Sequence, residues 1–248
     1  MDGLKRALLQ RILESRKPGA TIIPVIISSD KTQVTLFRNK AAYLVYLTIG
    51  NIPTAIRRQA SRHSYILLAY LPATKLEHVA NKTAKQRMMP YLFHACMSHI
   101  LGPLKSIGLD GLEMMSGDGA VHHCHPLFAL FIGDYPEQVL VTCVTSGDCP
   151  ACPAKQAELG HQPMLEYRDM TASNMALHHA DDTDLSIFVE QCQHLNIKPI
   201  PNPFWCDLPL VHIYRSVCPN ILHQLYQGAL KYIFTWVKTA YSPTEIDA

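Results

Sequence analysis

Residues 20–33 read ATIIPVIISSDKTQ, an apolar run that gives way to polar residues at Asp30. The β-branched residues of this run predict a buried strand, whereas a carboxylate is rarely buried without a partner. A strand end holds a side chain rigidly, so Asp30 is either a candidate site residue or the residue that opens a turn. A second apolar run, HPLFALFIGDYPEQ, leads into an aspartate in the same way at Asp134.

The rest of the chain alternates between strand-like and helix-like patterns. Short polar connections predict an antiparallel meander of three strands at residues 20–29, 33–37 and 42–50. Further segments are expected along the chain: an apolar run at 65–73, one or two helices in 75–107, a short strand at 139–145, an irregular segment at 148–210 and an amphipathic helix at 220–238. The apolar side of that last helix (Leu222, Leu225, Ala229, Ile233, Val237) is expected to face the core.

This order of elements predicts an α/β fold compatible with a ribonuclease H-like mixed sheet. In that fold the strands that carry Asp30 and Asp134 are neighbours, so the two carboxylates can face one point. Carboxylate pairs of this kind bind Mg²⁺ or Mn²⁺ and support in-line displacement at phosphorus. The expected parts are an amphipathic helix at 1–17, a partial ribonuclease H-like core at 18–147, an insertion at 148–238 and a tail at 239–248.

Composition and charge narrow the class of protein. The chain has 248 residues, 48% of them hydrophobic and 17% charged, which is typical of a globular protein. No apolar run is long enough for a membrane span, so no membrane partner is expected. Residues 1–90 hold 15 Lys and Arg against 4 Asp and Glu, although the whole chain carries only +2. A basic half indicates either an anionic partner, DNA first, or a solvated basic face; its candidate DNA-binding residues are Arg57, Arg58, Arg62, Lys85 and Arg87.

Several collinear blocks are more specific than these patterns. They are IIPVIISSDKTQVTLF, AYLVYLTIGNIPTAIRRQASRHSYILLAYLPATKL, LDGLEMMSGDGAVHHCHPLFALFIGDYPEQVLV, CPAC and PNPFWCDLPLVHIYRSVCPNILHQLYQGALK. Over residues 18–238 they resemble the Plavaka group of DNA transposases, which is related to the CACTA elements. The resemblance implies a DDE catalytic core that cuts and joins DNA with a divalent metal ion, and it carries the first two acids onto Asp30 and Asp134.

This chain differs from the family pattern at two positions, the third acid and residue 220. The family's third acid is expected farther downstream, and none of Glu190, Asp207 or Glu245 stands in a matching context. The family usually has an aspartate where this chain has Asn220, before ILHQL. We therefore expect a fold that is incomplete at its C-terminus and a chain that is inactive alone.

A cysteine pair, Cys149 and Cys152, has the C-x2-C spacing of half a zinc site. Candidates for the remaining ligands are His161, His178, His179, Cys192 and His194. We expect a structural Zn²⁺ knuckle here, with reduced thiols that bind no metal as the alternative. The run His122-His123-Cys124-His125 is expected to be the start of a strand and not a metal cluster. Adjacent strand residues face opposite sides, so at most alternate members of the run could share one ion.

Two other readings remain beside the transposase-derived one. The first is a non-catalytic DNA-binding or interaction protein, which predicts DNA affinity that falls steeply with salt and needs no Mg²⁺. The second is a functionless relic of a transposable element. A nuclear location is expected from the DNA substrate alone, and association into a homo-oligomer is expected if apolar area stays uncovered.

Overall fold

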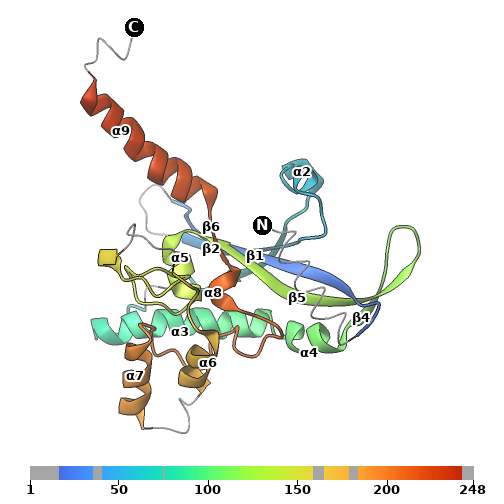
Figure 1. The fold of residues 1–248 in the computed structure, drawn as a ribbon, viewed down its shortest axis with the longest axis horizontal. Coiled ribbons are helices and arrows are strands. Elements are labelled where there is room, and N and C mark those ends of the chain that lie inside the picture. The colour runs from blue at the N-terminus through green and yellow to red at the C-terminus, as the bar shows by residue number, and fades with distance from the viewer. Residues whose placement is uncertain (1–16, 36–40, 75, 159–164, 179–183, 242–248) are drawn as a thin grey trace.

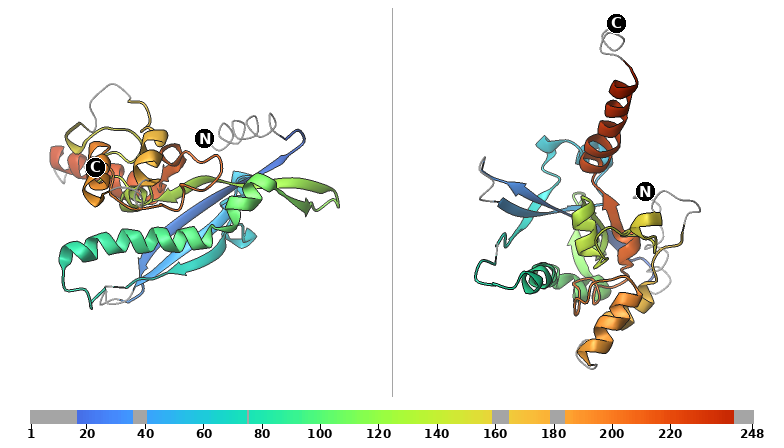
Figure 2. Two further views of the ribbon diagram at one scale, coloured as in Figure 1. Left: turned by 90° about the horizontal axis from the view of Figure 1, so that it is seen from below. Right: turned by 90° about the vertical axis from the view of Figure 1, so that its left-hand side faces the viewer.

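The computed structural model describes residues 17–35, 41–74, 76–158, 165–178 and 184–241 (Figure 1). The helix expected at residues 1–17 lies outside this part except for Lys17, and so does most of the tail expected at 239–248. Within the described part, a mixed sheet forms the centre of the molecule and helices lie against and around it (Figures 1 and 2).

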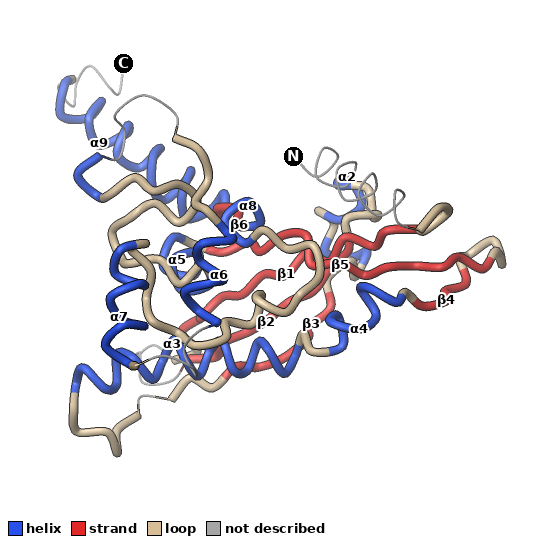
Figure 3. The backbone as a smooth tube through the Cα atoms, turned by 60° about the horizontal axis from the view of Figure 1, so that its bottom comes forward, coloured by secondary structure: helices blue, strands red, loops and turns tan. Residues whose placement is uncertain are grey.

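The sheet has six strands: β1 (Thr21–Gln33), β2 (Ala41–Ile49), β3 (Ile66–Leu71), β4 (Leu112–Met115), β5 (Val121–Gly133) and β6 (Val217–Pro219). Their order is β3-β2-β1-β5-β4, and β6 pairs with the last three residues of β5. The pairs β1·β2, β2·β3 and β4·β5 are antiparallel, whereas β1·β5 and β5·β6 are parallel. Figure 3 shows the strands as one red sheet flanked by blue helices.

The expected opening meander is present, but its strands differ from the prediction. The segment 33–37 forms no strand of its own within its described residues, because β1 continues past Asp30 to Gln33 and Val34 and Thr35 follow as loop. The third strand is instead β3, from the apolar run at 65–73. Pairing with β2 explains the extra length of β1, since it gives backbone partners as far as Gln33.

The strand expected at 139–145 is wrong, because residues 135–141 form helix α5 (Tyr135–Val141). Asp134 is the N-cap of this helix, and Pro136 lies in its first turn. Both are helix-start signals, and they outweigh the β-propensity of the run VLV. The chain therefore turns directly from β5 into a helix at Asp134.

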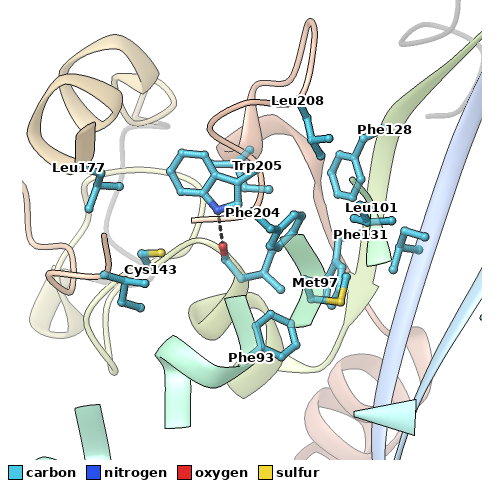
Figure 4. Packing of buried hydrophobic residues seen from close by; sticks show 14 of the residues in the cluster. Phe93, Met97, Leu101, Phe128, Phe131, Cys143, Leu177, Phe204, Trp205 and Leu208 are labelled. Carbon is cyan, nitrogen blue, oxygen red and sulfur yellow. Dashed lines mark hydrogen bonds between the residues drawn. The ribbon is translucent and has the colours of Figure 1, made fainter. Parts of the chain in front are cut away.

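The core lies between the sheet and helix α3 (Lys82–Ile100), which runs along one face of the sheet (Figure 2). Phe93 and Met97 of α3 pack with buried strand residues and with Phe204 and Trp205 from the later part of the chain (Figure 4). Trp205 is fully buried, and its indole Nε1 donates to the carbonyl oxygen of Val141 at 2.7 Å. Trp205 is therefore a packing residue of the core.

The remaining helical elements are shorter. They are α2 (Thr54–Arg57), η1 (Ala60–Arg62), α4 (Pro103–Asp110), η2 (Gln156–Glu158), α6 (Met170–His178), α7 (Leu185–His194), α8 (Ile213–Ser216), the π-helical η3 (Leu222–Leu230) and α9 (Lys231–Ala240). The segment 148–210 is therefore more ordered than its irregular pattern predicts. Its helices α6 and α7 are anchored in the core by Leu177, Phe188 and Cys192, which are all buried.

The last helix is present as expected, but its apolar side does not face the core. Leu222, Leu225, Ile233 and Val237 have exposed fractions between 44% and 51%. α9 directly continues η3, and Figures 1 and 2 show it projecting away from the sheet. Helical periodicity correctly predicts an amphipathic helix, but it cannot tell which surface covers the apolar side. No described helix is both long enough and apolar enough to span a membrane.

Candidate functional site

The two predicted aspartates lie at the same end of two neighbouring parallel strands, Asp30 within β1 and Asp134 directly after β5. The pairing of β1 with β5 ends at Ser28 and Ile132, and Asp30 and Asp134 each follow two residues later. Asp30 is still part of β1, whereas Asp134 is the first residue after β5, so both acids lie at the same end of the parallel pair. Asp30 is exposed and accepts a hydrogen bond from the hydroxyl of Thr32 at 2.7 Å.

Asp134 has one carboxylate oxygen engaged within its own helix turn. Its Oδ1 accepts from the backbone N–H of Glu137 at 3.0 Å, as an N-cap does. The side chain is only partly buried. A cap of this kind fixes the orientation of the carboxylate and leaves the lone pairs of Oδ2 for another partner.

A third carboxylate, Glu137, lies beside these two and was missed by sequence reasoning. It accepts a hydrogen bond from the Ser29 hydroxyl at 2.5 Å, and the Tyr43 hydroxyl lies 2.7 Å from both of its oxygens. Burial raises the pKa of Glu137, and the negative charges of Asp134 and Asp30 raise it further, while the two hydroxyls act in the opposite direction. Three acidic groups therefore share one end of the sheet.

Tyr43 lies beside the same acidic side chains. Burial raises the pKa of its phenol, and the adjacent Glu137 carboxylate raises it further. The ring lies 6.0 Å from that of Phe93, on the side of the sheet that α3 covers. The hydroxyl of Tyr43 thus stays protonated and acts as a donor to Glu137.

One sequence signal could have located Glu137. The run Asp134-Tyr-Pro-Glu137 has an N-cap residue, a proline in the first turn and an acid three residues after the cap. Its contact with Ser29 and Tyr43, 108 and 94 residues away in the chain, depends on strand pairing and has no local signal.

Asn220 lies at the same end of the sheet, directly after the third parallel strand, β6. Gly133 of β5 pairs with Pro219 of β6, so Asp134 and Asn220 each lie one residue past their strand ends. The backbone N–H of Asn220 donates to the carbonyl oxygen of Gly133 at 2.9 Å, and its side-chain Oδ1 accepts from the N–H of Leu222. An uncharged amide therefore stands where the third strand reaches the site.

The other acids considered for a third position are engaged elsewhere or lie outside the described residues. Asp207 forms an ion pair with Lys105 at 2.7 Å. Glu190 lies 3.8 Å from His194 on the exposed side of α7. Glu245 falls outside the part that the structure describes.

The candidate DNA-binding residues do not form one surface. Arg58 and Arg62 are exposed on the excursion between β2 and β3, whereas Lys85 and Arg87 lie in the first turns of α3, at the opposite side of Figure 1. Arg57 is buried, and its guanidinium donates to the carbonyl oxygen of Ile49 and to the Thr54 hydroxyl, each at 3.4 Å. The guanidinium of Arg57 therefore has partners within the chain, and its expected role in DNA binding stays a prediction.

The cysteine pair forms a tight turn. The N–H of Cys152 lies 3.4 Å from the sulfur of Cys149, and the N–H of Cys149 donates to Ala154. Burial raises the pKa of Cys152, and the adjacent Cys149 raises it further. Burial also raises the pKa of Cys192 to about 11, and this thiol is fully enclosed in the core.

Of the remaining predicted zinc ligands, the structure describes the side chains of Cys192, which lies in the core, and His194. His194 is next to Glu190, while His161 and His179, as well as the side chain of His178, lie outside the described part. Within that part no group of three or more His, Cys, Asp or Glu side chains is arranged to hold a metal ion.

Comparison with known families identifies the chain. The model of the Plavaka transposase family matches residues 4–237. The chain belongs to the Plavaka transposase family. The match spans the sheet, the segment 148–210 and most of the last helix, so the resemblance stated from the sequence blocks is confirmed.

Among the curated proteins searched, none matches this Plavaka family member. Membership of a transposase family implies an interaction with DNA. It does not by itself assign a role to Asp30, Asp134 or Glu137.

Proposed function

We propose that this Plavaka chain is the metal-binding part of a DNA-cleaving and strand-transferring domain with a ribonuclease H-like fold. The observation that carries the proposal is that Asp30 in β1 and Asp134 directly after β5 lie at the same end of two paired parallel strands. The strand order supports the fold, because β1, β2 and β3 form an antiparallel meander, β5 adds in parallel beside β1, and β6 adds in parallel beside β5.

The residues at this site fit a divalent cation of the Mg²⁺ or Mn²⁺ type. Such ions prefer carboxylate oxygens, and Mg²⁺ is commonly held by one or two carboxylates with water and substrate phosphate as the other ligands. Asp30 and the free oxygen of Asp134 would hold the ion. Bound there, it would supply positive charge to a phosphate undergoing in-line displacement.

The protein side chains have separate tasks in this scheme. Asp30 and Asp134 bind and orient the cation, and the N-cap bond of Asp134 limits its rotation. Arg58, Arg62, Lys85 and Arg87 contribute positive charge toward the DNA backbone from two sides of the molecule. A nuclear location follows from this substrate and is part of the same proposal.

Catalysis by this chain alone is proposed to be weak. Strand transfer depends on positioning and metal charge, and the site has two carboxylates with Asn220 at the third strand. Two acids support cation binding but give poor control of both reacting oxygens.

The test combines cation binding with DNA chemistry. Mn²⁺ titration should show a site that is lost in the Asp30→Asn, Asp134→Asn double variant, and element-end DNA should show little joining in Mg²⁺ or Mn²⁺. Equal Mn²⁺ binding by the unaltered chain and the double variant would contradict the proposed metal site. Efficient joining by the purified chain would contradict the proposed weakness of catalysis.

A structural Zn²⁺ at the Cys149–Cys152 turn is a second part of the proposal. The N–H to sulfur contact of Cys152 with Cys149 supports it, because such bonds stabilise thiolates that bind metal. Zinc content of the purified chain should fall in Cys149→Ser and stay unchanged in Cys218→Ser, which alters a cysteine of β6. Equal zinc content in both variants would show that Cys149 does not hold the zinc ion.

A non-catalytic DNA-binding function is the second candidate, and the exposed Arg58, Arg62 and Arg87 favour it. It predicts affinity for DNA that falls steeply with salt, is independent of Mg²⁺ and is unchanged in the Asp30→Asn, Asp134→Asn double variant. DNA binding that needs both the cation and the two aspartates would favour the catalytic reading instead.

A further inference from the structure

Glu137 connects the two halves of the carboxylate site. Its backbone N–H holds Asp134 through the N-cap bond, while its side chain reaches Ser29, the residue before Asp30. It also meets the Tyr43 hydroxyl on β2. One residue thus ties the start of α5 to both β1 and β2.

The carboxylate of Glu137 lies on the other face of the sheet from Asp30. Ser29 alternates with Asp30 along β1, is 6% exposed and points toward the α3 side, where Tyr43 packs near Phe93. The two hydroxyls occupy the oxygens of Glu137 from that side. Both carboxylate oxygens of Glu137 are thus engaged by hydroxyl groups on the α3 side of the sheet.

The chain leaves room for this connection at Gly133. A Cβ atom on Gly133 would lie 2.8 Å from the Cβ of Glu137 and 3.0 Å from a ring carbon of Phe131. Contacts under 3.0 Å between such atoms require something to shift, so the missing side chain allows Glu137 to lie across the end of β5. The arrangement is therefore built into the backbone as well as into the side chains.

We propose that Glu137 is a positioning residue that clamps the end of β5 to β1 and so holds Asp134 in place relative to Asp30 for cation binding. The inference rests on the proposed function, since it concerns the same metal site. It adds a residue that acts through hydrogen bonds to Ser29 and Tyr43 and never touches the cation.

The test measures Mn²⁺ affinity of the whole chain by electron paramagnetic resonance of the free ion, with thermal melting as a check of folding. Glu137→Met, which removes the acceptor oxygens, should weaken Mn²⁺ binding about tenfold or more, as loss of a residue that orients a metal ligand does. Glu137→Gln keeps an oxygen for Ser29 and an amide for Tyr43, and it should bind within about threefold of the unaltered chain because the clamp persists.

Two controls separate a positioning role from other roles. Glu190→Met removes an exposed acid on α7 and should leave Mn²⁺ affinity unchanged. If Glu137→Met does not fold, Tyr43→Phe removes one clamp donor at nearly constant shape and should weaken Mn²⁺ binding while Glu137 keeps its charge.

The outcomes distinguish this inference from the function beneath it. If the unaltered chain binds no more Mn²⁺ than the Asp30→Asn, Asp134→Asn variant, the metal site and the clamp both fail. If it binds Mn²⁺ and a folded Glu137→Met binds equally well, the clamp alone is overturned. If Glu137→Gln loses as much affinity as Glu137→Met, charge and not position is decisive, and the positioning role is contradicted.

Discussion

At the scale of single residues, Asn220 distinguishes this chain from the expected family pattern. It lies one residue past β6, level with Asp134 past β5, and its amide caps the N–H of Leu222. Asparagine and aspartate have nearly the same shape, and both can make this cap. The difference between them here is the charge that a cation would meet.

We expect Asn220→Asp to strengthen Mn²⁺ binding by about tenfold, because an added carboxylate increases the ligand charge at the site. Isothermal titration with Mn²⁺ measures the change. Asn220→Ser is the matched control, since it keeps a capping oxygen without adding charge. Unchanged affinity in Asn220→Asp would show that the side chain at position 220 does not reach the cation.

His94 gives a pH dependence of stability. Burial lowers the pKa of His94 to about 4, so the folded chain holds this ring in its neutral form. In that form its Nε2–H donates to the carbonyl oxygen of Leu140 at 3.0 Å. The unfolded chain has the higher pKa, about 6.5, so it binds the proton first as the pH falls. Stability from His94 is complete above about pH 6.5 and is lost progressively toward pH 4.

Urea unfolding at pH 7 and pH 5 should therefore show a loss of about 2 kcal/mol from this group. His94→Gln keeps a donor for Leu140 but does not titrate, so its stability should change less between the two pH values. The other histidines are common to both proteins and cancel in the comparison. Equal pH dependence would mean that His94 is protonated without cost in the folded chain.

At the scale of elements, the junction between β5 and α5 places two functions on Asp134. Asp134→Asn keeps the N-cap of α5, whereas Asp134→Ala removes it at a cost of about 1 kcal/mol of stability. Both variants should lose Mn²⁺ binding to the same extent, because each removes the charge. Thermal melting and Mn²⁺ titration of the pair measure the two effects separately, and an equally destabilised Asp134→Asn would contradict the capping role.

At the scale of the whole molecule, the projecting helix determines how the chain behaves in solution. Tyr232, Ile233, Trp236 and Val237 are 44–67% exposed on one side of α9. Monomeric proteins rarely expose apolar patches of more than a few hundred Å². We therefore expect the purified chain to associate with itself through this side of the helix.

The double variant Ile233→Glu, Trp236→Glu should shift the chain toward the monomer, which light scattering after gel filtration measures. Lys238→Glu changes charge on the polar side of the same helix and should leave association unchanged. An unaltered chain that is already monomeric at high concentration would contradict the expectation.

The sequence alone predicted features that depend on neighbouring residues. Apolar runs located β1, β3 and β5, and helical spacing located α3 and α9, because side-chain periodicity reflects local geometry. The same reasoning placed Asp30 and Asp134 at one end of the sheet, and the collinear blocks identified the family. It was wrong at residues 139–145, where the cap at Asp134 outweighed β-propensity.

Only the tertiary structure decided which distant segments meet. The register of β1 against β5 brings Ser29 to Glu137, and the short β6 brings Asn220 level with Asp134. The exposure of Ile233 likewise depends on whether another surface covers α9. A one-dimensional pattern encodes how each residue is turned toward or away from a core, but pairing between remote strands is selected by the packing of the whole sheet.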